Sequence, residues 1–269
     1  MRLVKNYLVP ESIEQAMEML KSPDYKIIAG GSKINSEKTG EYGLIDIRKC
    51  GLNYIKVTQG ILHIGAMTRI SELLDNKDFC GLGESFVNAL KSTGHAIVRN
   101  QITIGGSVSS LTPWFNLATL LLLADANIIY IDENNSGSIS FREYCDNSPR
   151  EFIRRKIIKE ITIPIKKYEF KYIRFSQTEV DYAPLYVACS GKTPDSLKIA
   201  ISGCLPEPKL FDNSDFHISD LSSETVEKSC NDFIEKIKGK VISTNVNFSR
   251  EYIIKILPRL IKESIMEEK

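Results

Sequence analysis

Hydrophobic residues recur with helical spacing near the start of the chain. Within residues 12–20, Ile13, Ala16, Met17 and Leu20 share one helical face, and Ser12 is a suitable N-cap. Short apolar runs then predict strands at residues 26–29, 43–47, 54–57, 61–64 and 127–132. A short helix is expected to begin at residues 70–74, where Thr68 or Ser71 could cap it, and helical spacing predicts another at residues 82–91. Residues 117–126 are apolar on most faces and predict a buried helix. Residues 93–100 are expected to be irregular or extended, residues 134–137 form a turn cluster, and residues 139–144 and 157–164 complete a mixed region.

The pattern restarts after residue 167. Three strand-like runs at residues 168–175, 185–189 and 197–201 precede a Ser- and Asp-rich loop at residues 213–223. Two helices are expected after this loop, at residues 225–238 and 252–262. Strands followed by helices are typical of an α+β arrangement.

Two short glycine-bearing loops are the most informative feature. The first is Ala29-Gly30-Gly31-Ser32, after the strand that ends in Ile27-Ile28, and the second is Thr103-Ile104-Gly105-Gly106-Ser107, directly after Ile102. Without a Cβ, adjacent glycines let the backbone come close to a ligand, and successive N–H groups in such a turn suit phosphate oxygens. Two such loops suggest a clamp on a pyrophosphate, although each taken alone is also ordinary turn chemistry.

Composition narrows the class of protein. With 269 residues, 42% of them hydrophobic, the chain can bury a substantial core, and a net charge of +1 offers no electrostatic argument for nucleic acid or a membrane surface. The first residues show no apolar signal core, and the longest apolar stretch, residues 117–131, is too short to span a bilayer. We therefore expect a cytoplasmic protein.

Metal chemistry is not indicated. The six cysteines, at positions 50, 80, 145, 189, 204 and 230, include no C-x-x-C pair, and only three histidines occur. Clustered thiolates are what a zinc or iron–sulfur site needs, so buried free thiols are the expected state.

Four segments in order resemble signatures of the flavoprotein component of molybdenum hydroxylases, the family of xanthine dehydrogenase and carbon monoxide dehydrogenase. Residues 98–108 (VRNQITIGGSV) resemble I-R-N-x-A-T-I-G-G-N-I, and residues 29–34 (AGGSKI) resemble A-G-G-T-D-L. Residues 64–73 (IGAMTRISEL) resemble I-G-A-x-T-x-x-x-E-L, and residues 201–208 (ISGCLPEP) resemble G-G-V-A-P-x-P. These segments span most of the chain.

The resemblance implies an α+β fold, with a two-part FAD-binding PCMH-like domain over residues 1–165 and a smaller α+β C-terminal domain over residues 166–269. The subdomains would be residues 1–55 and 56–165. It implies noncovalent FAD and electron transfer from an iron–sulfur partner to an acceptor such as NAD+. A separate molybdenum-cofactor subunit would oxidise the substrate, with a purine-like compound as the family-level expectation.

The resemblance places no catalytic residue in this chain but implies a set of cofactor-binding residues. These are Ala29, Gly30, Gly31, Ser32, Lys33, Ile34, Asn35, Arg99, Thr103, Ile104, Gly105, Gly106, Ser107, Ser110, Asn116, Arg174 and Asp181.

Several of these residues allow two interpretations. Lys33 stands where the family often has Asp, and it either neutralises phosphate or points to solvent; Arg99 either contacts ligand or holds the loop. Asn116 stands at a cofactor-contacting Asp position. Trp114 either covers a flavin ring or packs in the core, with Tyr182 a weaker stacking candidate, and a neutral hydrogen-bonding role suits His95 better than catalysis.

Three alternatives to the electron-relay function remain open. The departures at Ser32-Lys33 and Asn116 favour an interaction subunit with a degenerate flavin site. A stand-alone flavin oxidase is opposed by the modest length and by the lack of a histidine in the first loop for covalent attachment. A nucleotide-binding module without redox function is the third, and both G-x-G-x-x-G and Walker patterns are absent.

Overall fold

The computed structural model describes residues 3–33, 41–133, 135–179 and 181–266. Its contacts divide the chain into two compact units that do not follow chain order. Unit 1 combines residues 1–80, 94–111 and 126–165, and unit 2 combines residues 81–93, 112–125 and 166–269. The sequence-based division at residue 165 stays a prediction about domains.

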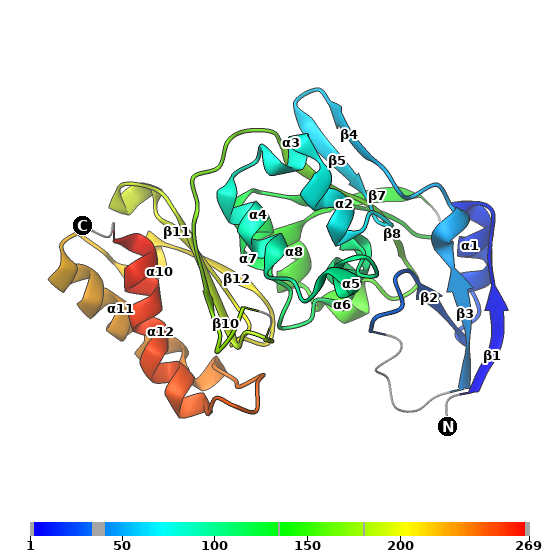
Figure 1. Ribbon diagram of the computed structural model, residues 1–269. Helices are drawn as coiled ribbons and strands as arrows, with labels where there is room; N and C mark the ends of the chain where they lie inside the picture. Colours follow the sequence, from blue (N-terminus) through cyan, green and yellow to red (C-terminus); the bar gives the residue numbers. More distant parts are fainter. Residues whose placement is uncertain (1–2, 34–40, 134, 180, 267–269) are drawn as a thin grey trace. The chain divides into compact units, whose positions relative to one another are not determined.

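Unit 1 begins with a parallel sheet of three strands in the order β1 (Leu3–Leu8), β3 (Glu41–Asp46), β2 (Tyr25–Ile28). Helix α1 (Ile13–Leu20) lies beside this sheet (Figure 1) and packs the apolar face predicted from its spacing, including Ala16 and Met17, against Ile45. As predicted, Ser12 caps α1 by accepting a hydrogen bond from Gln15 N.

A second sheet in unit 1 is antiparallel throughout. Its strand order is β4 (Ile55–Thr58), β5 (Ile61–Gly65), β8 (Ile157–Pro164), β6 (Asn127–Ile131), β7 (Ser136–Ser140). The helical segments of unit 1 are η2 (Ile47–Lys49), α2 (Ile70–Asp75), α3 (Lys77–Cys80), α5 (Ala96–Arg99), α6 (Ile104–Ser110), α8 (Phe141–Asp146) and α9 (Pro149–Phe152). Helix α6 packs against β8 and β5, which brings the second glycine motif onto this sheet.

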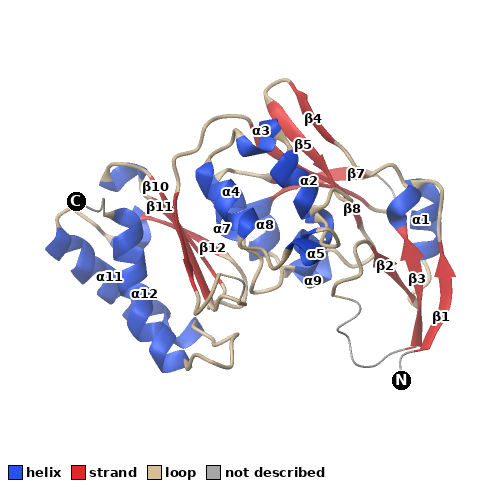
Figure 2. Cartoon of the chain, viewed as in Figure 1, coloured by secondary structure: helices blue, strands red, loops and turns tan. Residues whose placement is uncertain are grey.

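Unit 2 is a four-stranded antiparallel sheet with helices on both faces. The strand order is β12 (Lys209–Asp212), β11 (Lys198–Ser202), β10 (Leu185–Ser190), β9 (Lys171–Phe175). Helices α11 (Ser223–Ile237) and α12 (Arg250–Ile265) run beside each other next to this sheet (Figure 2). The shorter elements are α4 (Glu84–Lys91), α7 (Ala118–Leu123), α10 (Asn213–Phe216), η3 (Pro194–Ser196) and η4 (Lys238–Lys240).

The alternation of side chains along β10 explains why α7 belongs to unit 2. Leu185 and Val187 face the core formed with α11 and α12, so the intervening Tyr186 and Ala188 face the other side, where α7 packs. All six residues of α7 are buried, as the continuous apolar run predicted.

The structure corrects several elements of the sequence-based prediction. Strands β1 and β12 and helix α10 were not predicted, and residues 96–99 form α5 rather than irregular chain. Gly137 lies in β7 rather than in a turn, while Asn134 lies outside the described residues. Neither Thr68 nor Ser71 caps α2: Arg69 is its N-cap residue, and the Glu72 carboxylate accepts from Arg69 N at 2.6 Å.

Asp46 closes the carboxyl end of the parallel sheet. It pairs in register with Ile28, is fully buried, and accepts hydrogen bonds from Arg48 N at 3.0 Å, Arg48 Nε at 2.6 Å and the Tyr7 hydroxyl. Burial alone raises the pKa of this carboxyl, but the hydrogen bonds from Arg48 and Tyr7 together outweigh it, so the pKa lies below its usual value.

Asp46→Asn should therefore lower the free energy of unfolding at pH 7 by about 1–3 kcal/mol, since Arg48 and Tyr7 lose a charged acceptor. Because the folded pKa is depressed, the carboxylate stabilises the fold above the ordinary pKa of about 3.9, and this contribution is lost as the pH falls through the folded value. Urea unfolding at pH 7 and near pH 3 measures both effects. Glu11→Gln, which removes an exposed ion pair to Lys49, is the control and should change stability by about 0.5 kcal/mol or less; equal stability of Asp46→Asn and wild type at pH 7 would contradict the assignment.

Candidate functional site

The first glycine loop follows β2 directly and has donors available for a ligand. Gly31 adopts φ +77°, a left-handed conformation that glycine accepts readily, and Ser32 and Lys33 are exposed. Within the described ranges, no hydrogen bond is made by the backbone N–H groups of Gly30, Gly31 and Ser32. These N–H groups and the Ser32 hydroxyl form a donor set suited to phosphate oxygens. Ile34 and Asn35, also predicted to bind the cofactor, lie outside the described residues.

Gly30 brings this loop against the chain before the second motif. A Cβ built on Gly30 would lie 1.7 Å from the carbonyl oxygen of Gln101, so no side chain fits there. The first glycine of the loop thus permits a backbone-to-backbone contact inside unit 1. Nothing in the residue type of Gln101 indicated this contact, because its backbone carbonyl makes it.

The second motif is the first turn of a helix rather than a loop after a strand. Thr103 is the N-cap of α6, as its residue type allowed, and its Oγ1 accepts from Gly106 N at 3.2 Å. The other first-turn donors also have partners: Ile104 N bonds Thr68 O at 2.9 Å, Gly105 N bonds Ala66 O at 3.0 Å, and Ser107 N bonds Thr103 O at 3.0 Å. Three of the N–H groups that a helix start normally leaves open, those of Ile104, Gly105 and Gly106, are therefore satisfied within unit 1.

Gly105 has a packing role. A Cβ on this residue would lie 2.5 Å from the Ala66 Cβ, whereas one on Gly106 would meet only Thr103 Oγ1, at 2.9 Å. Ala66 and Thr68 belong to the I-G-A-x-T segment that carried part of the family resemblance. Their function, accepting the N–H groups of α6, had no signal in residue type because it is performed by backbone carbonyls.

A partly buried polar network supports the turn that contains Ala66 and Thr68. Thr68 Oγ1 donates to Tyr54 O at 3.0 Å, and the Tyr54 hydroxyl donates to Glu160 Oε2 at 2.6 Å. His63 Nδ1 lies 2.9 Å from Glu160 Oε1. Burial of Glu160 raises its pKa, but the hydrogen bonds from Tyr54 and His63 bring the net pKa below its usual value, so the group is a carboxylate at neutral pH.

The remaining unit 1 candidates hold the segments around the two motifs. The Arg99 guanidinium donates to Gly94 O, and this hydrogen bond links the last residue of the short helix α5 to the chain just before the helix. Lys33 Nζ donates to Ser110 O at 3.2 Å, so this exposed lysine also contacts the end of α6. The Ser110 hydroxyl itself donates to Ser107 O at 3.2 Å. His95 is exposed and serves as the N-cap residue of α5.

Asn116 lies in unit 2, with both amide hydrogens engaged there. It is 3% exposed, and its Nδ2 donates to Ala89 O at 3.0 Å and to Ser92 Oγ at 2.9 Å. An aspartate at this position could not donate to the Ala89 carbonyl, so the surroundings select the amide. Its predicted contact with the cofactor stays a prediction.

Arg174 and Asp181 also lie in unit 2 and contact each other. The guanidinium of Arg174 donates to the Asp181 carbonyl, to the Ser176 hydroxyl and to Thr178 O, the last at 3.0 Å. Arg174 Nε is buried without a partner among the described groups. Arg174 therefore organises the loop after β9, and its predicted role toward a cofactor is not tested by these contacts.

Trp114 is on the surface of unit 2 rather than in its core. It is 40% exposed and lies against Tyr182, which is 65% exposed, with ring centroids 4.7 Å apart. The core-packing interpretation of Trp114 is therefore wrong. Covering a flavin ring stays a prediction for both side chains.

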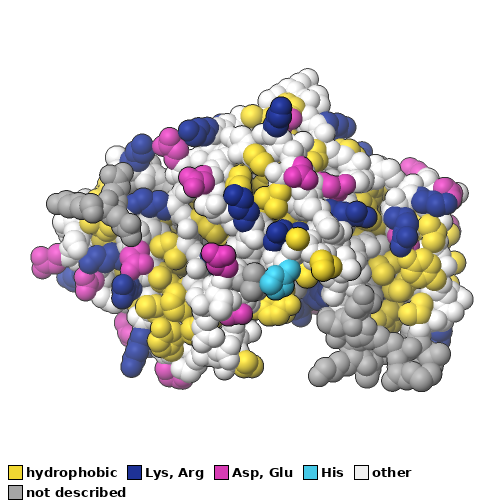
Figure 3. Space-filling model, viewed as in Figure 1, with side chains coloured by type: hydrophobic (Ala, Val, Ile, Leu, Met, Phe, Trp, Pro, Cys, Tyr) yellow, Lys and Arg dark blue, Asp and Glu magenta, His cyan; other side chains and the backbone are white. Residues whose placement is uncertain are grey.

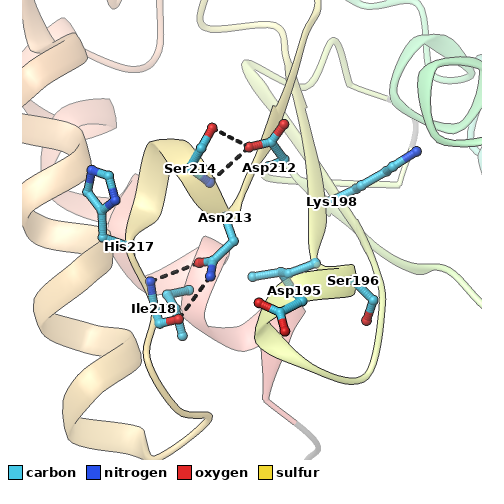
Figure 4. Close-up of a pocket in the computed structure, with 9 residues that line it drawn as sticks. Asp195, Ser196, Lys198, Asp212, Asn213, Ser214, His217 and Ile218 are labelled. Atoms are coloured by element: carbon cyan, nitrogen blue, oxygen red, sulfur yellow. Dashed lines mark hydrogen bonds between the residues drawn. The ribbon is translucent and has the colours of Figure 1, made fainter.

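A shallow hollow of about 650 Å³ lies elsewhere in unit 2, between η3 and the end of β12 (Figure 4). Asp212 Oδ1 accepts from Ser214 N and Oγ, and the Asn213 side chain bonds the backbone of Ile218. These polar groups stabilise the turn that ends β12.

Charge, metal ligands and thiols add little to the site. On the face shown in Figure 3, basic and acidic side chains are interspersed without a large patch of one sign. In the described part of the chain, no three His, Cys, Asp or Glu side chains gather as metal ligands, and no helix is both long and apolar enough to cross a bilayer. The cysteines are free, as predicted; five are buried and Cys80 is half-buried, and burial raises the pKa of Cys204 to about 12.

Comparison with known proteins identifies the class. The family described as "FAD binding domain in molybdopterin dehydrogenase" matches residues 3–166. The glyceraldehyde dehydrogenase medium chain of Sulfolobus acidocaldarius is 24% identical over 254 residues, covering 90% of this chain and 88% of that protein. Among solved structures, carbon monoxide dehydrogenase from Hydrogenophaga pseudoflava superposes with a TM-score of 0.82 at 19% identity, over 98% of this chain and 96% of that chain. Quinoline 2-oxidoreductase from Pseudomonas putida 86 superposes with a TM-score of 0.79 at 20% identity, over 97% of this chain and 94% of that chain.

The chain therefore belongs to the FAD-binding domain family of molybdopterin dehydrogenases. It is the flavoprotein subunit of an oxidoreductase of the molybdenum hydroxylase type, and its cofactor is FAD. The predicted α+β, PCMH-like fold is confirmed.

The residues of unit 1 fit part of this cofactor. The open N–H groups of Gly30, Gly31 and Ser32 and the Ser32 hydroxyl are donors of the kind that a pyrophosphate requires. By contrast, the first-turn N–H groups of α6 are already used. The fit therefore rests on the first loop, and the second motif provides its support.

Gly30→Ala and Gly105→Ala should each lower the free energy of unfolding, by about 1–3 kcal/mol or more, because the new methyl group overlaps Gln101 O or Ala66. Gly239→Ala is the matched control, since nothing lies within 4 Å of its Cβ position, and it should be neutral or slightly stabilising. Urea unfolding of the FAD-free proteins measures all three. Wild-type stability of the Gly105→Ala protein would refute the packing role.

Proposed function

We propose that this chain binds FAD noncovalently, with the pyrophosphate at the first glycine loop, and relays electrons in the cytoplasm from an iron–sulfur partner to an acceptor such as NAD+. Bound FAD supplies the redox chemistry, since it exchanges electrons one or two at a time. The observation that carries the proposal is the set of open donors on Gly30, Gly31 and Ser32 in a chain of an FAD-binding family.

Most of the predicted residues of unit 1 have a distinct part in this proposal. Gly31 and Ser32 hold phosphate oxygens through their N–H groups, and the Ser32 hydroxyl adds a further donor. Ala29 and Gly30 set the path of the loop. Thr103, Ile104, Gly105, Gly106 and Ser107 form the platform against which the loop is held, and Arg99 and Ser110 fix the segments on either side of it.

The candidates in unit 2, Asn116, Arg174 and Asp181, are proposed as cofactor-binding residues on the basis of the family resemblance. Trp114 and Tyr182 offer exposed aromatic surface, and Arg174 holds the backbone of the loop that includes Asp181. Asn116 is proposed to bind through its carbonyl oxygen, because its amide hydrogens are engaged.

Partners are proposed from the relatives. One relative is named as a medium chain, and another, in Paenarthrobacter nicotinovorans, as subunit alpha of the 6-hydroxypseudooxynicotine dehydrogenase complex. By analogy we propose that this chain assembles with an iron–sulfur subunit and a molybdenum-cofactor subunit. The relatives named here differ in substrate, so the proposed purine-like substrate would be decided by the molybdenum subunit.

The binding site is tested with two glycines of matched conformation. Gly31 has φ +77° and Gly60, in the hairpin between β4 and β5, has φ +74° with open space around its Cβ position. Alanine at either position should cost about 1 kcal/mol of stability through backbone strain. Only Gly31→Ala should also weaken FAD, by about fivefold or more, because the strain reorients the phosphate-binding N–H groups.

Flavin fluorescence titration of the FAD-free proteins, with the visible spectrum before and after acid precipitation, measures affinity and attachment. Wild type should bind one FAD per chain and release it on acid treatment. Absence of FAD binding would favour a degenerate interaction subunit, and oxidation of a small substrate by the chain alone would favour a stand-alone oxidase.

A further inference from the structure

Lys33 connects the first glycine loop to a distant part of unit 1. It directly follows Ser32, and its ammonium donates to the carbonyl oxygen of Ser110 at 3.2 Å, across 77 positions of sequence.

The carbonyl that Lys33 contacts belongs to a helix end that needs donors. The last carbonyls of a helix have no partner within the helix, and the C-terminal end carries partial negative charge. In α6, Ser107 O accepts from Leu111 N at 2.9 Å, and Val108 O accepts from the Tyr144 hydroxyl at 3.1 Å. Leu111 turns the chain away with φ +36°. Lys33 supplies the donor for Ser110 O and adds a positive charge at the negative end of the helix.

We propose that Lys33 is a positioning residue for the cofactor: by capping the C-terminal end of α6 from the first glycine loop, it holds the N–H groups of Gly31 and Ser32 in their ligand-binding arrangement. This inference rests on the proposed function, FAD binding at that loop. The loop is then fixed on both sides of its donors, by the Gly30 backbone contact with Gln101 before them and by the Lys33 hydrogen bond after them.

This role differs from direct neutralisation of phosphate. The hydrogen bond to Ser110 O places the ammonium at the helix end before any ligand binds. A methionine of similar length would remove the hydrogen bond to Ser110 O, whereas an arginine would keep both the positive charge and the donors. An aspartate would place a negative charge at the negative end of α6.

The test compares Lys33→Met, Lys33→Arg and Lys33→Asp with wild type by FAD titration at two ionic strengths. Lys33→Met should bind FAD about two- to fivefold more weakly, the size expected from losing one favourable helix-end interaction at an exposed position. Lys33→Arg should retain affinity close to wild type, and Lys33→Asp should be weakest. The salt dependence of affinity should be the same in wild type and Lys33→Met, because the tether acts before the anion arrives.

Hydrogen exchange of the FAD-free proteins provides the second readout. Lys33→Met should speed exchange of the amides at the C-terminal end of α6, including Leu111 N, which bonds Ser107 O, while the exchange of β3 and β8 stays as in wild type. Unchanged FAD affinity or unchanged exchange in Lys33→Met would overturn the proposal, as would a weaker salt dependence, which would indicate direct contact with phosphate. If wild type itself binds no FAD, the proposed function fails, whereas the exchange result still decides whether the tether exists.

Discussion

The first glycine loop meets the chain just before the second motif through a contact of bare backbone. Because Gly30 has no side chain, the loop after β2 can lie against the carbonyl of Gln101, at a place where a Cβ would come within 1.7 Å. A second contact of this kind, between Gly105 and Ala66, places the first turn of α6 on the turn after β5. These two contacts join the parallel sheet, α6 and the antiparallel sheet of unit 1, and the position of the phosphate-binding donors depends on them.

The two motifs, although alike in sequence, therefore differ in physical role. In the second motif the helix-start donors are consumed by Thr103, Ala66 and Thr68, so Gly105 serves packing. In the first motif the N–H groups of Gly31 and Ser32 stay available to a ligand. The Tyr54–Glu160–His63 network supports α6 indirectly, because it fixes the turn whose backbone carbonyls accept hydrogen bonds from the first turn of α6.

Much of the fold could be predicted from the sequence because apolar residues mark its elements, at helical spacing in α1 and as a continuous run in α7. Strand β1 was missed because its residues 4–7 are exposed and lack alternation, and α5 because a four-residue helix has too few positions to show a period. The first glycine motif is a loop after a strand, as predicted, whereas the second begins a helix, and the contacts of the two motifs could not be predicted. Those contacts depend on backbone carbonyls of Gln101, Ala66 and Thr68, which any residue type can supply. The hydrogen bond from the Asn116 amide to Ala89 O could not be predicted for the same reason, because its acceptor is a backbone carbonyl.

Amide hydrogen exchange, resolved by residue with and without FAD, tests the division of roles between the motifs most directly. The account predicts that the amides of residues 104–107 exchange slowly in the FAD-free protein and change little on binding, because their hydrogen bonds already exist. The amides of Gly31 and Ser32 should exchange quickly without FAD and become protected with it. Fast exchange at residues 104–107 that FAD suppresses, with no change at Gly31 and Ser32, would contradict the account.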